Sequence, residues 1–141
     1  MATKQIWLNL PVKDVSASKK FYNALGFKLN PKHPSSDSSA CYFIGETNFV
    51  VMLFEEETFK SFTNSPVTDT SKSAEMLISF DAENKEEVDE IAKKVVNAGG
   101  VLFSEPSTIQ DWMYGCGFTD LDGHRWNVLY MDLDNAPKTY K

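Results

Sequence analysis

The chain has 141 residues, of which 42% are hydrophobic and 24% charged, a balance typical of a globular protein with enough material for one core. Its formal net charge of −6 repels nucleic-acid phosphates and anionic lipids, so we expect neither as a partner. The N-terminal residues carry no signal-peptide pattern and no apolar run is long enough to cross a bilayer, so we expect a cytoplasmic protein without membrane contact.

The first half of the chain has the pattern of one strand, one helix and three further strands. A proline- and serine-rich loop at 31–39 separates the second strand from a hairpin. The expected elements are a strand at 6–12, a helix that begins after Asp14 or Ser16 and ends at Gly26, a short strand at 27–30, and a hairpin over 40–54 that bends at 45–48.

The second half repeats this order. Asn84 and Glu87 form a capping-box pattern before a helix whose apolar stripe is Val88, Ile91 and Val95. The expected elements are a strand at 75–81, this helix up to Gly99-Gly100, a strand at 101–103, and a hairpin over 114–132 with a type I′ turn at Asp122-Gly123. The stretch between the halves reads as one helical turn and a polar linker.

Each half offers one helix for four strands, so each helix is expected to cover one face of a sheet and leave the other face free. On that other face, alternating residues of four strands mix apolar and polar side chains, which is typical of a ligand pocket. The pocket residues predicted from this alternation are Trp7, Asn9, Met52, Phe54, Glu75, Asn127 and Leu129. Trp112 and Tyr114 are added because they can stack on a flat ligand; the alternative is that they pack at a sheet edge or a dimer contact.

The two histidines and two cysteines are predicted to have no role in chemistry. His124 shares strand parity with the helix-packed face, so we expect local hydrogen bonds to Asp120 or Asp122, and we expect His33 to be a surface residue. Cys41 and Cys116 form no C-x-x-C pair, which favours two free thiols over a disulfide or a metal cluster. Cys116 also has no neighbouring base in the sequence that would make it a nucleophile.

Motifs at both ends of the chain resemble the vicinal oxygen chelate superfamily, the group of glyoxalase I, bleomycin- and fosfomycin-resistance proteins and extradiol dioxygenases. V-x-D, S-x-x-F-Y and L-G-F occur within VKDVSASKKFYNALGF, and D-x-D-G-H precedes the last strand within DLDGHRW. The segments NLPVKD, FKSFT and WMYG make the chain most similar to the bacterial predicted lactoylglutathione lyase-like group. The resemblance covers nearly the whole chain and implies a single glyoxalase-like domain over 1–141.

Pattern and resemblance together predict an α+β fold, in which two tandem βαβββ modules form a curved, half-open mixed β-barrel with helices on the outer face. The boundaries expected are module one at about 4–55, a linker at about 56–73, module two at about 74–132 and a C-terminal tail at 133–141. The family also implies that such modules pair within one chain or across a homodimer, and we expect a homodimer.

In metal-dependent relatives, inward residues of four strands hold a divalent ion that binds the substrate. The resemblance places these positions at Trp7, Met52, Glu75 and Asn127. An indole offers no lone pair to a metal, and a thioether suits soft ions. One carboxylate and one carboxamide, even with Asn9 added, fall short of the usual three protein ligands. We therefore predict no metal site and no cofactor, with divalent metal binding at most weak.

The pocket without a metal leaves three hypotheses open. The first is a glyoxalase/bleomycin-resistance-like protein that binds a small, aromatic or hydrophobic molecule. The alternative is an enzyme, either a metal-dependent lyase or isomerase similar to lactoylglutathione lyase or a ring-cleaving dioxygenase, with Glu75 as its one retained ligand or its catalytic base. A third reading is a regulatory domain with a vestigial pocket. The plainer reading of Glu75 itself is an exposed residue at a strand end.

Overall fold

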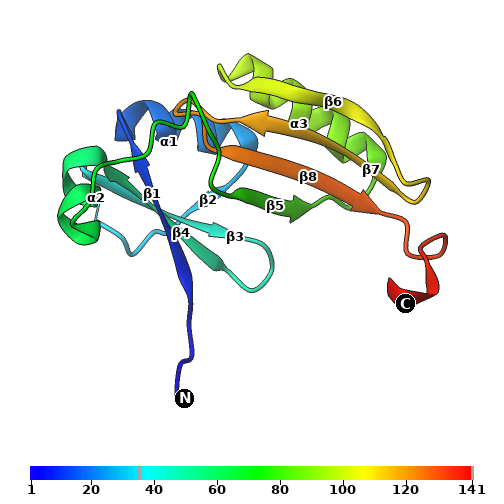
Figure 1. Cartoon of the computed structure of the whole chain (residues 1–141), viewed down its shortest axis with the longest axis horizontal. Coiled ribbons are helices and arrows are strands. Elements are labelled where there is room, and N and C mark those ends of the chain that lie inside the picture. The colour runs from blue at the N-terminus through cyan, green and yellow to red at the C-terminus, as the bar shows by residue number, and fades with distance from the viewer. Residues whose placement is uncertain (35, 141) are drawn as a thin grey trace. The chain divides into compact units, whose positions relative to one another are not determined.

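The computed structural model describes residues 1–34 and 36–140, with the side chain of residue 140 left out (Figure 1). Ser35 of the predicted loop at 31–39 and Lys141 of the predicted tail lie outside the described residues. The chain divides into two compact units, residues 1–69 and 70–141, and each is described by itself.

The first unit is a four-stranded sheet with the strand order β1-β4-β3-β2. β1 runs parallel to β4, and the other neighbouring strands are antiparallel. The elements are β1 (Trp7–Val12), α1 (Val15–Leu25), β2 (Lys28–Leu29), β3 (Ser39–Ile44), β4 (Phe49–Glu55) and α2 (Glu56–Thr63). The predicted helical turn of the linker is therefore a helix of eight residues, α2.

α1 begins and ends where the sequence places its signals. The Asp14 carboxylate accepts a hydrogen bond from the Ala17 amide at 3.0 Å, and Gly26 ends the helix at φ 96°. One stripe of α1, which includes Phe21 and Tyr22, is buried, as are alternate residues of β1 and β4. This apolar layer fixes which face of the first sheet is covered by α1.

The second unit has the same plan, with the strand order β5-β8-β7-β6 and β5 parallel to β8. The elements are β5 (Leu77–Asp81), α3 (Lys85–Asn97), β6 (Val101–Ile109), β7 (Met113–Thr119), β8 (Arg125–Met131) and the 3-10 turn η1 (Lys138–Tyr140). β6 is longer than the predicted strand at 101–103. Its pairing with β7 has two register shifts, and the second, between Ser104 and Ser107, spans Pro106, which an edge strand tolerates.

α3 also confirms its predicted capping and stripe. The Asn84 side chain accepts a hydrogen bond from the Glu87 amide at 2.8 Å, and the Glu87 carboxylate accepts one from the Glu83 amide at 2.6 Å. Its buried stripe packs over β7 and β8, where the rings of Phe118 and Trp126 lie parallel with centroids 6.2 Å apart. The predicted α+β fold of two βαβββ modules is confirmed.

The turn between β7 and β8 differs from the predicted type I′ turn, because the last strand pair, Thr119 and Arg125, leaves a loop of five residues. The buried Asp120 carboxylate accepts hydrogen bonds from the backbone amides of Asp122 at 3.0 Å and His124 at 2.9 Å. Gly123 has φ 88°, but Asp122 is not among the residues with positive φ, which a type I′ turn requires at both positions. None of the helices that the structure describes is long and apolar enough to cross a membrane.

Candidate ligand-binding faces

Each sheet has one face packed against a helix, α1 or α3, and we call the opposite face its open face. On the first sheet, the strand register places Asn9 beside Met52 and Trp7 beside Val50. Side chains at paired positions point to the same face. Trp7, Asn9, Met52 and Phe54 therefore share the open face of the first sheet, as predicted from alternation.

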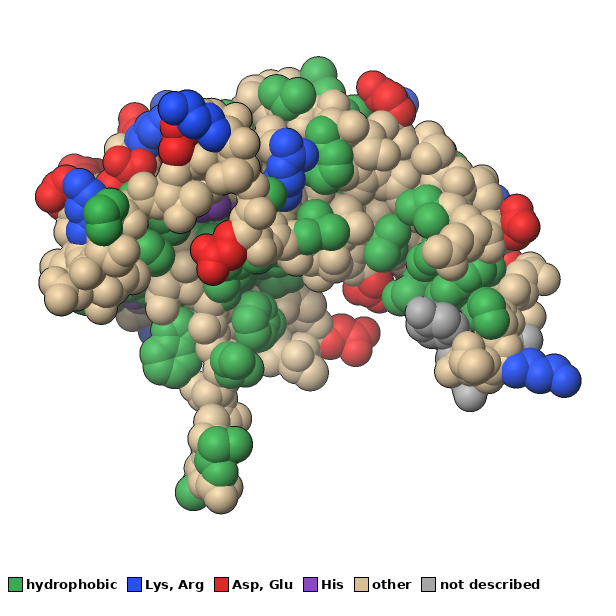
Figure 2. All heavy atoms as spheres, in the orientation of Figure 1, with side chains coloured by type: hydrophobic (Ala, Val, Ile, Leu, Met, Phe, Trp, Pro, Cys, Tyr) green, Lys and Arg blue, Asp and Glu red, His purple; other side chains and the backbone are tan. Residues whose placement is uncertain are grey.

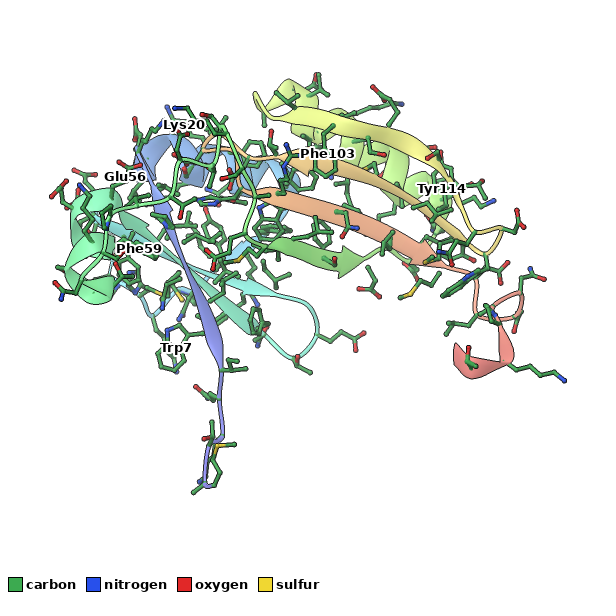
Figure 3. The ribbon with its side chains drawn as sticks, viewed as in Figure 1. Trp7, Lys20, Glu56, Phe59, Phe103 and Tyr114 are labelled. Carbon is green, nitrogen blue, oxygen red and sulfur yellow. The ribbon has the colours of Figure 1, made fainter. Side chains whose placement is uncertain are left out.

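A concavity of about 580 Å³ occupies the end of this face where β1 begins. Trp7 (Figure 3) belongs to its lining with 55% of its surface exposed. Met52 and Val50 form another part of the lining. Phe54 lies outside the lining because its ring packs edge-to-face against Phe62 of α2, with centroids 5.0 Å apart. The first concavity therefore uses Trp7 and Met52 and excludes the α2 end of the sheet.

Residues that were not predicted complete this concavity. Asn30 follows β2, and Phe43 of β3 pairs with Val50, which puts its ring on the open face. Exposed apolar side chains gather around the base of the N-terminal segment (Figure 2), where Ile6 is 79% exposed. Alternation in residues 40–44 contained the signal for Phe43, since Phe43 has the parity opposite to the buried Tyr42.

On the second sheet, Asn127 and Leu129 lie on the open face, paired with Ser79 and Asp81 of β5. The Asn127 Oδ1 atom is buried and has no hydrogen-bond partner among the described residues. A buried amide oxygen without a donor costs about 1–3 kcal/mol. Asn127 is thus a polar group whose best partner is not in the described part of the chain.

Beside Asn127, an aromatic ring lies directly on the backbone of β7. Gly117 pairs with Asn127, and a Cβ atom added at Gly117 would lie 2.4 Å from the ring of Phe103. Only glycine permits this approach without a shift of the ring. The guanidinium carbon of Arg125 lies 4.6 Å from the centroid of the same ring, within cation–π distance. Sequence alternation did not single out Phe103 or Arg125.

Glu75, the predicted catalytic residue, is exposed and sits in a bend before β5 begins at Leu77. It therefore lies outside the pleated part of the second sheet. The plainer sequence reading, an exposed glutamate at a strand end, describes its position.

Trp112 and Tyr114 do not line an open face. Tyr114 pairs with Tyr130, which shares the parity of the buried Trp126. Its hydroxyl donates a 2.7 Å hydrogen bond to Asp89 of α3, which raises the pKa of the Tyr114 phenol (Figure 3). Trp112 is only 5% exposed and packs inside the second unit, whereas Tyr114 lies partly exposed against α3.

A local hydrogen bond between His124 and Asp120 was predicted and is present, with the His124 backbone amide donating to the Asp120 carboxylate. His33 was expected at the surface; it is half-buried, with Nε2 at 3.0 Å from the Ser39 hydroxyl. Both cysteines are free, as predicted, and both are buried. Burial raises the pKa of the Cys116 thiol to about 11, with the charges of Asp89 and Glu105 adding to the rise, which keeps Cys116 a neutral thiol near pH 7.

The residues at the superfamily's ligand positions do not fit a divalent metal. Trp7 and Met52 offer no hard donor, Glu75 is exposed before its strand, and Asn127 supplies a carboxamide only. Among the described residues, no group of three or more His, Cys, Asp and Glu side chains is arranged to hold a metal ion. No chemistry through a metal is therefore derived for this chain.

The model for the N-terminal region of bleomycin resistance protein-like sequences matches residues 4–41. No curated protein matches the chain significantly. Among solved structures, a hypothetical protein from S. aureus is 36% identical, with a TM-score of 0.81 over 92% of this chain and 95% of that one.

Two more distant structures share the fold. A glyoxalase/bleomycin resistance protein/dioxygenase family enzyme from Burkholderia phytofirmans is 18% identical, with a TM-score of 0.73 over 87% of this chain and 94% of that one. The fosfomycin resistance protein FosX from Listeria monocytogenes, in complex with Mn(II) and sulfate, is 20% identical, with a TM-score of 0.70 over 100% of both chains. The two distant structures show the shared fold; together with the family-model match at 4–41 and the 36% identity to a relative over nearly the whole chain, the protein belongs to the vicinal oxygen chelate superfamily of glyoxalase and bleomycin-resistance proteins.

Proposed function

We propose that this protein binds a small aromatic or hydrophobic molecule in the concavity on the open face of the first sheet, without a chelated metal ion. The observation that carries the proposal is Trp7, whose indole is 55% exposed at the edge of a concavity of about 580 Å³. The sequence resemblance assigns Trp7 and Met52 to positions at which metal-dependent members of the superfamily carry metal ligands. An apolar pair at these positions favours contact with a ligand ring over coordination.

The side chains of the concavity suit an aromatic ligand. An indole offers a large flat surface whose stacking with another ring contributes about 0.5–1.5 kcal/mol beyond the area buried. Met52 has a flexible, polarizable side chain that adapts to different ring shapes. Asn30 and Asn48 add hydrogen-bonding groups at the border, which is the usual division between apolar lining and a few orienting polar groups.

The enzymatic alternative gains no specific support. Glu75 would have to act as a base or as the one retained metal ligand, and its exposed position in the bend before β5 leaves it outside the sheet that carries the open face. The binding function is therefore the stronger conclusion.

We also propose a homodimer. Both sheets end in a strand with one unpaired edge, β1 in the first and β5 in the second. Exposed apolar side chains accompany these edges, with Ile6 79% and Leu77 53% exposed, and such edges promote association between chains. Light scattering after size exclusion is expected to give twice the mass of 15.9 kDa, and a monomer at micromolar concentrations would contradict the dimer.

The binding proposal is tested with a neutral aromatic probe, p-nitrobenzyl alcohol, followed by tryptophan fluorescence. Trp112 and Trp126 are 5% and 1% exposed, so quenching by a bound ring reports mainly on Trp7. We expect saturable quenching in the wild type, and calorimetry is expected to show binding weakened about tenfold in Trp7→Ala and in Met52→Ala.

Leu133→Ala is the matched control, because Leu133 is 54% exposed and lies in the tail after β8. The control is expected to bind like the wild type. Absence of saturable binding, or equal affinity in Trp7→Ala and the wild type, would overturn the proposed function.

A further inference from the structure

Arg125, the single arginine of the chain, lies on the open face of the second sheet. Its guanidinium lies over the ring of Phe103, and that ring lies over Gly117. The stack has three layers, namely backbone, ring and guanidinium. A guanidinium that stacks on a ring is partly pre-organised and loses less conformational freedom when it binds a ligand than a free one does.

The Arg125 guanidinium has no carboxylate partner among the described residues. The Lys60–Glu57 ion pair lies on α2, in the other unit. Arg125 is partly buried, which strengthens its interaction with an incoming anion. A planar guanidinium offers paired N–H donors that match the two oxygens of a carboxylate.

A second observation points to a ligand at the same place. Asn127 lies two residues after Arg125 on the same face and pairs with Gly117, over which the Phe103 ring lies. Its buried Oδ1 atom lacks a donor among the described residues. Among the described residues, the Arg125 guanidinium thus lacks a carboxylate partner and the neighbouring Asn127 Oδ1 atom lacks a hydrogen-bond donor.

We propose that the open face of the second sheet binds a small organic acid, whose carboxylate pairs with the Arg125 guanidinium and whose neighbouring O–H or N–H donates to Asn127 Oδ1. Phe103 is a positioning residue that holds the guanidinium. All residues of this site belong to the unit 70–141, whereas Trp7 and Met52 belong to the unit 1–69. A net charge of −6 disfavours acids elsewhere on the chain, so a local cation is needed to hold one.

Benzoate and its neutral isostere benzamide test the charge requirement by isothermal titration calorimetry on the wild-type protein. Benzoate is expected to bind about tenfold more tightly, because a charge-assisted bidentate pair replaces a neutral contact. Raising the salt concentration is expected to weaken the binding of benzoate but not that of benzamide. Equal affinity for the two probes, or no binding of benzoate, would overturn the proposal without recourse to a variant.

Arg125→Gln is expected to lose the preference for benzoate, and Arg125→Lys to keep only part of it because an ammonium group has no planar fork. Lys94→Gln removes the same charge from the exposed side of α3 and is expected to leave benzoate binding unchanged. 3-Hydroxybenzoate, which adds a donor, is expected to bind more tightly than benzoate, with the gain lost in Asn127→Leu. Unchanged benzoate binding in Arg125→Gln would refute the site.

The neutral probe of the first concavity separates the two proposals. Arg125→Gln is expected to bind p-nitrobenzyl alcohol like the wild type, so loss of benzoate alone is specific to Arg125. If p-nitrobenzyl alcohol fails to bind the wild type while benzoate binds through Arg125, the first proposal fails and the second stands.

Discussion

The open faces of the two sheets have the same backbone plan and different chemistry. In each unit a central strand pairs with a parallel edge strand on one side and an antiparallel strand on the other. At the centre of the first face, Met52 pairs with Asn9 and Cys41; at the centre of the second, Asn127 pairs with Ser79 and Gly117. The two units therefore share their strand pairing and their helix-packed apolar layer, whereas the side chains on their open faces differ in chemistry.

The largest expected difference is in the stability loss on replacing a tryptophan of a core face, Trp126, and one of an open face, Trp7. Trp126 is 1% exposed and stacked on Phe118, so Trp126→Ala is expected to destabilise the protein by about 3–5 kcal/mol. Trp7 is 55% exposed, so Trp7→Ala is expected to change stability by less than about 0.5 kcal/mol. Urea unfolding of both variants measures the difference, and similar losses would place Trp7 in a core.

The next effect concerns the thiol under the helix-packed face of the second sheet. The folded-state pKa of Cys116 is about 11 against an ordinary value of 9.0, so the unfolded chain loses this proton first as the pH rises. The contribution of the thiol to stability is therefore intact below pH 9 and decreases between pH 9 and 11, by about 2–3 kcal/mol at most.

Cys116→Val removes this titration and is expected to flatten the stability curve in that window relative to the wild type. The comparison is made by urea unfolding at pH 8, 9, 10 and 11, the points being chosen to bracket the two pKa values. Parallel curves for variant and wild type would show that the thiol does not titrate differently on folding.

Two glycines of β7 lie against neighbours of different rigidity on the open face of the second sheet, one against backbone and the other against a side chain. A Cβ at Gly115 would lie 2.5 Å from the backbone oxygen of Val128, whereas one at Gly117 meets the side chain of Phe103. Gly115→Ala is expected to cost about 1–3 kcal/mol and Gly117→Ala less, because the partly exposed ring can turn aside. Thermal unfolding ranks the two, and the reverse order would mean that the Phe103 ring is the more rigid element.

The smallest expected effect concerns the amide without a donor. Asn127→Leu replaces a carboxamide whose Oδ1 atom is buried and unsatisfied by an apolar group of similar size, which is expected to leave the free energy of unfolding unchanged or to raise it by about 1 kcal/mol. Asn9→Leu on the exposed part of the first face serves as the control, with a change within about 0.5 kcal/mol. A clear loss of stability in Asn127→Leu would show that the amide has a partner in solution.

Helix caps and sheet faces were predictable because their signals are local. Asp14, Asn84 and Gly26 act within one turn of the helix ends that they define. Residues of β1 and β4 alternate clearly enough to place Trp7 and Met52 on one face. Such signals need no knowledge of distant contacts.

Other parts of the candidate site depend on contacts that the sequence does not display. In β7 the glycines at 115 and 117 remove the alternation that would have shown Tyr114 on the helix side. The strand β5 begins at Leu77, which leaves Glu75 outside the sheet. The stack of Phe103 and Arg125 joins residues of β6 and β8, which lie on either side of β7, and the pairing of β6 with β7 is irregular. No local sequence pattern therefore reveals the stack.

The most direct test of two open faces with different chemistry is a two-dimensional ¹⁵N NMR titration of the labelled protein with each probe. p-Nitrobenzyl alcohol is expected to shift the Trp7 indole Nε1–H, and benzoate is expected to shift the Arg125 Nε–H and the Asn127 side-chain amide. The two sets of shifted signals should not overlap. If both probes shift the same signals, or if neither probe shifts Trp7 or Arg125, the division of ligand chemistry between the two faces is wrong.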